Sequence, residues 1–129
     1  MKKLITILLL ISTVCKAQIE LADDYSFKQD KILHVSAGGG ISAGVFLLVN
    51  NKTNDVNLAF RAGWMSAAFI GFAKEFGDGI SGKTMSLSDF SYTVLGGLTS
   101  AFIMKGITKY RNKKQAKRDK KLRAALNIN

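Results

Sequence analysis

The stretch DKILHVSAGGGISAGVFLLVN, residues 30–50, decides the fold of this chain. It opens with three ionisable side chains, Asp30, Lys31 and His34, and continues into an uncharged run over residues 35–51. The stretch shows no strand-like alternation, and the whole chain has no proline, so it predicts a helix. A helix of about 20 residues is about 30 Å long, the thickness of a bilayer core. The stretch therefore predicts a membrane helix that begins with charged residues.

Two further apolar segments of similar length follow, over residues 56–77 and 87–109. Short polar turns, NNKTND and GDGISGKTM, separate the three segments, so consecutive helices are expected to run in opposite directions. The sequence thus predicts an all-α fold, a small antiparallel three-helix membrane-associated bundle. The uncharged runs of the second and third segments cover only residues 62–73 and 90–104, and Arg61 must snorkel or face a partner helix. A compact exported bundle outside the membrane is the alternative.

Helix-start signals and small residues refine this picture. Thr53 or Asn54 is a plausible N-cap for the second helix, and Ser86 is one for the third. The sequence SLSD places Asp89 at the third helical position, which predicts a capping box with Asp in place of the usual Glu. Small residues at helical spacing predict close helix contacts. They are Gly40 and Gly44, then Gly63, Ala67 and Gly71, then Gly96 and Ser100.

The N-terminus has the form of an export signal. MKK is positively charged, LITILLLISTV is an apolar core of eleven residues, and Ala17 precedes a predicted cut at Gln18. The single cysteine, Cys15, is either discarded with the signal or lipidated, although Val14 is larger than the residue that a lipid-attachment signal places there. The predicted organisation is a signal peptide over residues 1–17, a polar linker over 18–29, a three-helix domain over 30–110 and a basic tail over 111–129.

The net charge of +10 belongs to the C-terminal end. From Lys105 onward the chain has ten basic residues and one acid, Asp119, which gives +9. Cytoplasmic segments of membrane proteins are rich in Lys and Arg, so we expect an inner-membrane protein with this tail in the cytoplasm, near anionic lipid. The alternative location is the periplasm or the outer membrane. Apart from Tyr110 the tail lacks aromatic residues for base stacking, so nucleic acid is not an expected partner.

In such an arrangement the start of the first helix, the end of the second and the start of the third meet on the periplasmic side. Charged and hydroxyl side chains are concentrated at these three places. A charge about one turn inside a helix end is costly in a membrane unless it is paired. The sequence therefore predicts one shared polar cluster. Its members are Asp30, Lys31, His34, Lys74, Glu75, Asp78, Ser86 and Asp89.

The order and spacing of these eight residues resemble the YfiM-type exported proteins of unknown function. More distantly they resemble VanZ-like membrane proteins, which carry a similar DK..H and a late acidic pair. The resemblance covers about residues 28–104 and implies a small cell-envelope protein. YfiM-type proteins are described as lipoproteins, and this chain departs from them in the residue before Cys15 and in its long basic tail.

Three roles for the cluster follow from its chemistry. It is a structural ion-pair lock, a site for a divalent cation or for the phosphate of a lipid headgroup, or an enzyme site. In the enzyme role His34 is the acid or base, oriented by Asp30 or Glu75, and acts on a lipid or glycan headgroup. We expect no cofactor, and partners among membrane lipids, envelope proteins or glycans. The stretch GDGISGKT matches the phosphate-binding loop of nucleotide-binding proteins, but it follows a helix instead of a strand, which favours a Gly-rich turn.

Overall fold

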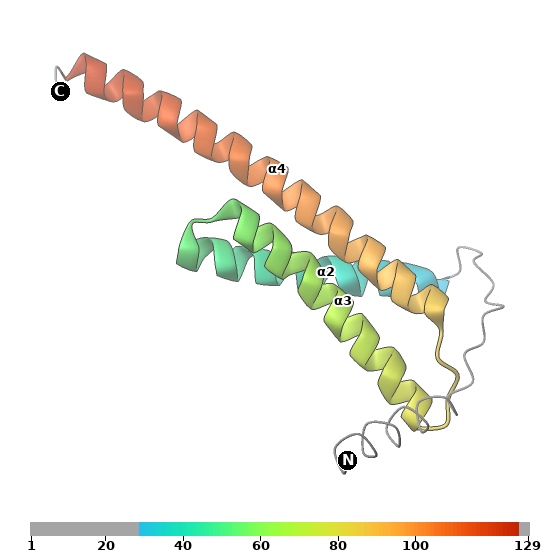
Figure 1. The fold of residues 1–129 in the computed structure, drawn as a ribbon. Helices are drawn as coiled ribbons and strands as arrows, with labels where there is room; N and C mark the ends of the chain where they lie inside the picture. The colour runs from blue at the N-terminus through green and yellow to red at the C-terminus, as the bar shows by residue number, and fades with distance from the viewer. Residues whose placement is uncertain (1–28, 127–129) are drawn as a thin grey trace, which may run out of the picture.

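The computed structural model describes residues 29–126, and this part of the chain forms three α-helices and no strand. Helix α2 covers Gln29–Thr53, α3 covers Val56–Ile80 and α4 covers Leu87–Ala125 (Figure 1). The all-α prediction is confirmed. The predicted signal peptide, Cys15 and nearly all of the predicted linker lie outside the described residues.

The turn between α2 and α3 contains only two residues outside the helices. Asn54 adopts a left-handed backbone with φ of 53°, a conformation that Asn tolerates better than most side chains do. Asp55 is the N-cap of α3, and its carboxylate accepts hydrogen bonds from the backbone N–H groups of Asn57 and Leu58 at 2.8 and 3.0 Å. The predicted cap at Thr53 or Asn54 is therefore wrong, because Thr53 is still part of α2.

The connection between α3 and α4 is confined to residues 81–86. Helix α3 continues through the first four residues of GDGISGKT, so this stretch does not form a phosphate-binding loop. Ser86 caps α4 as predicted, accepting the Asp89 N–H at 3.1 Å. The backbone N–H of Ser86 donates to Glu75 of α3 at 2.9 Å. In the predicted capping box that bond would have gone to the Asp89 carboxylate, so a neighbouring helix completes the cap instead.

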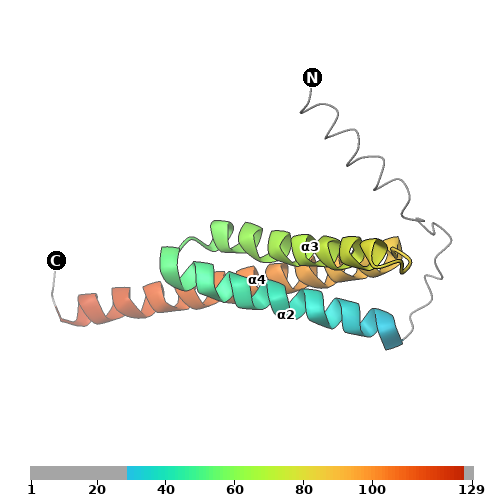
Figure 2. The same cartoon turned by 90° about the horizontal axis from the view of Figure 1, so that it is seen from below.

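Helix α4 is much longer than the predicted segment, which ended at residue 109. It has 39 residues and continues without interruption through most of the predicted basic tail. Lys, Arg, Gln and Ala dominate this part, and all four favour helix. Its C-terminal part extends past the ends of the other two helices (Figures 1 and 2).

The closest helix contact joins α2 to α4 through two glycines. A Cβ atom added at Gly38 would lie 2.0 Å from the Thr93 carbonyl oxygen, and one added at Gly96 would lie 2.1 Å from the Val35 carbonyl oxygen. Only glycine permits this approach. On α2 the predicted contact row was wrong, because a Cβ at Gly40 or Gly44 would meet nothing within 4 Å.

On α3 and α4, most of the small residues that were predicted to form helix contacts are buried. Gly63, Ala67 and Gly71 of α3 are buried, and so is Gly96 of α4, which is followed by buried Gly97 and Ala101. Ser100 is only half-buried. The contact face of α2 runs instead through Gly38, Ser42 and Phe46. These residues place the three helix backbones close together.

Small and polar residues line the interior, and large apolar residues cover the outside. Phe46 is the largest fully buried side chain, followed by Ser42 and Ser88. Large side chains such as Leu33, Phe69 and Phe102 point outward with 65, 73 and 57% of their surface exposed. Among the described residues, α2 is the one helix long and apolar enough to cross a membrane.

Candidate functional site

The structure brings all eight predicted cluster residues to one end of the molecule, in two groups that meet at Ser86. We call the first the histidine group, formed by Asp30, Lys31 and His34 of α2 with Asp89 and Thr93 of α4. The second is the glutamate group, formed by Lys74, Glu75 and Asp78 of α3 with Lys83 and the Ser86 backbone. The start of α2, the end of α3 and the start of α4 therefore lie together, as the sequence predicted.

The Asp89 carboxylate is the centre of the histidine group. One of its oxygens pairs with the Lys31 ammonium, and the other lies 3.6 Å from His34 Nε2. Asp30, one turn before His34 on α2, approaches the same ring nitrogen with a carboxylate oxygen at 3.9 Å. Both distances to Nε2 are longer than a hydrogen bond. The Lys31 and Asp89 side chains are only 9 and 13% exposed, whereas that of Asp30 is 61% exposed.

Thr93 fixes the orientation of the imidazole ring. Its Oγ1 lies 3.1 Å from His34 Nδ1 and donates its own proton to the Asp89 carbonyl oxygen at 2.9 Å. A hydroxyl has one proton, so Thr93 accepts from His34, and Nδ1 carries a hydrogen. In the neutral ring Nε2 then has a free lone pair directed toward the two carboxylates.

The glutamate group closes the loop between α3 and α4. Glu75 is 4% exposed, and its carboxylate receives the Lys74 ammonium at 2.7 Å and the Ser86 N–H at 2.9 Å. Lys74 also pairs with Asp78 at 3.2 Å, and Lys83 pairs with Asp78 at 3.6 Å. This group ties the helix ends together, and Glu75 has no contact with His34 among the interactions that the described residues make.

The ion pairs shift the pKa values of three groups. Burial raises the pKa of the Asp89 carboxyl, but the Lys31 ammonium and the charge of His34 more than offset this, and the net pKa is lowered. The Lys74 hydrogen bond lowers the pKa of Asp78. Burial lowers the pKa of Lys74, but its two carboxylate partners reverse the effect, and the net pKa is raised. All three groups are held in their charged forms.

A groove of about 270 Å³ runs from the histidine group along the outside of the molecule between α2 and α3. Leu33, Ala37, Ile41 and Ile70 form its apolar walls. Its charged end is formed by Asp30, His34 and Lys74, and Thr93 of α4 also lines it. The groove therefore joins a charged end to an apolar channel.

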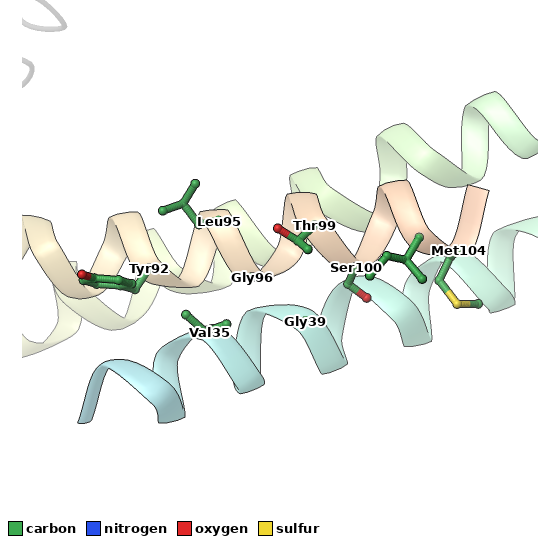
Figure 3. Close-up of a pocket in the computed structure, with 9 residues that line it drawn as sticks. Val35, Gly39, Tyr92, Leu95, Gly96, Thr99, Ser100 and Met104 are labelled. Carbon is green, nitrogen blue, oxygen red and sulfur yellow. The ribbon is translucent and has the colours of Figure 1, made fainter. Parts of the chain in front are cut away.

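A larger groove of about 440 Å³ lies between α2 and α4 (Figure 3). Its residues come from Val35 and Gly39 on α2 and from the stretch between Tyr92 and Met104 on α4, and no carboxylate, lysine or histidine lines it. Figure 3 shows Val35 and Gly39 facing Gly96 and Ser100 across the groove. Two of its lining residues, Gly39 and Gly96, have no side chain, and its polar side chains are those of Tyr92, Thr99 and Ser100.

The sequence did not single out two residues of the site, Lys83 in the glutamate group and Thr93 in the histidine group. Thr93 orients the His34 ring. It lies one turn after Asp89 on the same face of α4, and this i, i+4 spacing is the signal that could have identified it. No family model, curated protein or solved structure matches the chain. The resemblance to YfiM-type and VanZ-like proteins therefore stays a prediction.

Proposed function

We propose that this chain is a small YfiM-like protein of the cell envelope that binds the polar headgroup of a membrane lipid or lipid-linked species. In this proposal its three helices cross the inner membrane as an antiparallel bundle. The polar cluster lies on the periplasmic side, and the basic end of α4 lies in the cytoplasm. The observation that carries the proposal is the groove between α2 and α3, which connects the charged cluster to the apolar outer surface.

The distribution of side chains supports a membrane location. In water, large apolar side chains would be buried, whereas here they cover the surface and small residues fill the interior. Small residues at helix contacts are typical of helices that pack in lipid, where burying apolar surface gains little. Only 17% of the most apolar part of α2 is buried inside the protein, so the rest of this part is available to lipid.

The groove suits an amphipathic ligand. An acyl chain in the surrounding lipid can lie along Leu33, Ala37 and Ile70 while its headgroup meets His34 and Lys74. The Lys74 side chain is half exposed, so its ammonium is accessible to a phosphate oxygen.

The basic end supports the proposed orientation. Lys105 lies 4.6 Å above the Phe60 ring, which fixes the start of the charged region against α3. Beyond it, α4 continues straight (Figure 1). Because the charge of anionic lipid acts over only about 8–10 Å, the first turns of the basic end are close enough to be attracted and the last turns project away.

An acid–base enzyme is the second candidate. Its support is the His34 ring, which Thr93 orients and which lines the groove. Asp30 and Asp89 are the carboxylates near this ring, and Glu75 is committed to Ser86 and Lys74. In an enzyme, His34→Gln would abolish turnover of a headgroup substrate while lipid still bound.

The test is lipid binding by the purified protein with a blocked groove. Ala37→Leu places a larger side chain in the groove, whereas Ser36→Leu adds the same side chain at an exposed position that lines neither groove. Native mass spectrometry of both variants in mild detergent should show retained phospholipid on wild type and Ser36→Leu, and little on Ala37→Leu. Equal retention by all three proteins would contradict the proposal.

A further inference from the structure

We infer that Asp30, His34 and Asp89 form a binding site for one divalent transition-metal cation of the zinc type. The three side chains each offer one ligand atom, and these atoms lie within 4.8 Å of one another. One imidazole nitrogen with two carboxylate oxygens is a ligand set that such ions accept. Its role in headgroup binding rests on the proposed function, but the site itself is testable without lipid.

The hydrogen bonds of the histidine group leave the metal-binding nitrogen free. Because Thr93 uses its proton on the Asp89 carbonyl, His34 Nδ1 must be the donor in their contact. A metal-ligating histidine characteristically donates its other ring N–H to such an outer partner, which orients the ring. Thr93 therefore orients the His34 ring in the same way as such a partner orients a metal-binding histidine.

The spacing of the ligand atoms fits a single small ion. Bonds of 2.0–2.2 Å in a tetrahedral site separate neighbouring ligand atoms by roughly 3.3–3.6 Å. His34 Nε2 lies 3.6 Å from Asp89 and 3.9 Å from Asp30, which is too far for hydrogen bonds and within a few tenths of an ångström of the tetrahedral separation. The ligand oxygens of the two carboxylates lie within 4.8 Å of each other and must move closer together when an ion binds. The exposed Asp30 side chain can supply this small movement.

The charge balance at this end also favours a cation. Among residues 29–126, four carboxylates, on Asp30, Glu75, Asp78 and Asp89, face three ammonium groups, on Lys31, Lys74 and Lys83, and this set carries one negative charge when His34 is neutral. Three of the carboxylates have a lysine partner. Asp30 faces only His34 among the described residues, so the uncompensated charge lies beside the free nitrogen.

Lys31 limits how Asp89 can bind the ion. Its ammonium occupies one carboxylate oxygen, so only the oxygen that faces His34 is available. With three protein ligands, a tetrahedral ion keeps one open position, as catalytic and ligand-binding metal sites do. Asp30 and His34 both line the groove between α2 and α3, so a headgroup oxygen can reach that position.

Metal binding is best tested with Co²⁺, which reports its own coordination by absorption. Metal-stripped wild-type protein in detergent should bind one Co²⁺ per chain, show the visible spectrum of a tetrahedral site and release Co²⁺ to Zn²⁺. Asp30→Asn removes one ligand at an exposed position, so the protein should remain folded while its Co²⁺ affinity falls at least about tenfold. Asp78→Asn makes the same chemical change nearby, outside the ligand set, and should bind like wild type.

Two results would overturn the metal site. One is wild-type protein that shows no tetrahedral Co²⁺ spectrum, and the other is equal affinity in wild type and Asp30→Asn. The experiment contains no lipid, so it separates the two proposals. If wild-type protein binds Co²⁺ but Ala37→Leu retains as much lipid as wild type, the metal site is supported and the headgroup role is rejected. If Ala37→Leu loses lipid but wild-type protein does not bind Co²⁺, only the headgroup role is supported.

Discussion

The two ends of this molecule use charged residues in opposite ways. At the cluster end, the described part of the chain brings together four carboxylates, three lysines and one histidine, and the Lys31, Glu75 and Asp89 side chains are largely buried. At the other end, the α4 residues beyond Tyr110 are exposed, and lysine and arginine predominate there. Buried charged side chains need partners of opposite charge, whereas exposed side chains can carry a large excess of one charge. The cluster end should therefore respond strongly to single substitutions, and the basic end should not.

Breaking the buried pair between α2 and α4 should have the largest effect. Asp89→Asn removes the carboxylate charge that pairs with the buried Lys31 ammonium, and we expect a loss of roughly 3 kcal/mol in the free energy of unfolding. The double variant Lys31→Met with Asp89→Leu removes both charges and should recover most of that loss. Chemical denaturation in detergent measures all three proteins. If the double variant is no more stable than Asp89→Asn, the pair is not what holds these helix ends.

Disturbing the glycine contact between α2 and α4, which brings the histidine group together, should have the second-largest effect on stability. Gly96→Ala puts a methyl group against the Val35 carbonyl and should cost roughly 1–3 kcal/mol. Gly40→Ala is the matched control, because space is open around that position and alanine favours helix by about 1 kcal/mol. Thermal melting of both variants tests this. Equal destabilisation by the two changes would show that the helices do not meet at Gly96.

Acid should weaken the cluster end selectively. The pKa of Asp89 is lower in the folded protein than in the unfolded chain, so its contribution is complete above the unfolded pKa and is lost as the pH falls through the folded pKa. The difference in melting temperature between wild type and Asp89→Asn should therefore shrink as the pH falls from about 6 to about 3. A difference that stays constant over this range would mean that the carboxylate charge does not stabilise the fold.

The basic end should give the smallest effect. Lys117→Gln and Arg118→Gln remove exposed charges that make no ion pair within the part of the chain described here. Each should change the free energy of unfolding by less than about 0.5 kcal/mol. Denaturation curves that shift by more than this would indicate that the basic end folds back onto the bundle.

Local patterns in the sequence predicted much of this structure. The uncharged runs, the turn residues and the Ser86 cap identified three helices, and the alternation of short turns brought the eight cluster residues to one end. The length of α4 was missed because the prediction ended the helix where the apolar residues end. Helix propensity, which Lys, Arg and Gln share with Ala, continues past that point.

Contacts between helices were harder to predict. Every residue of α2 from Gly38 to Gly44 is small except Ile41, so the sequence offers several equivalent faces, and the structure uses Gly38 instead of Gly40 or Gly44. Likewise the pattern placed Glu75 in the cluster but could not show that it caps α4 instead of meeting His34. These choices depend on how the helices are rotated about their axes.

The proposal that the two charged ends lie on opposite sides of the membrane is tested most directly by locating each end. The only cysteine is Cys15, so Cys15→Ser provides a background for Thr84→Cys at the cluster end and Gln115→Cys at the basic end, both exposed positions. A maleimide that cannot cross the inner membrane should label Thr84→Cys in intact cells, and label Gln115→Cys only after that membrane is permeabilised. Labelling of both positions in intact cells would contradict a bundle that crosses the membrane with its two charged ends on opposite sides.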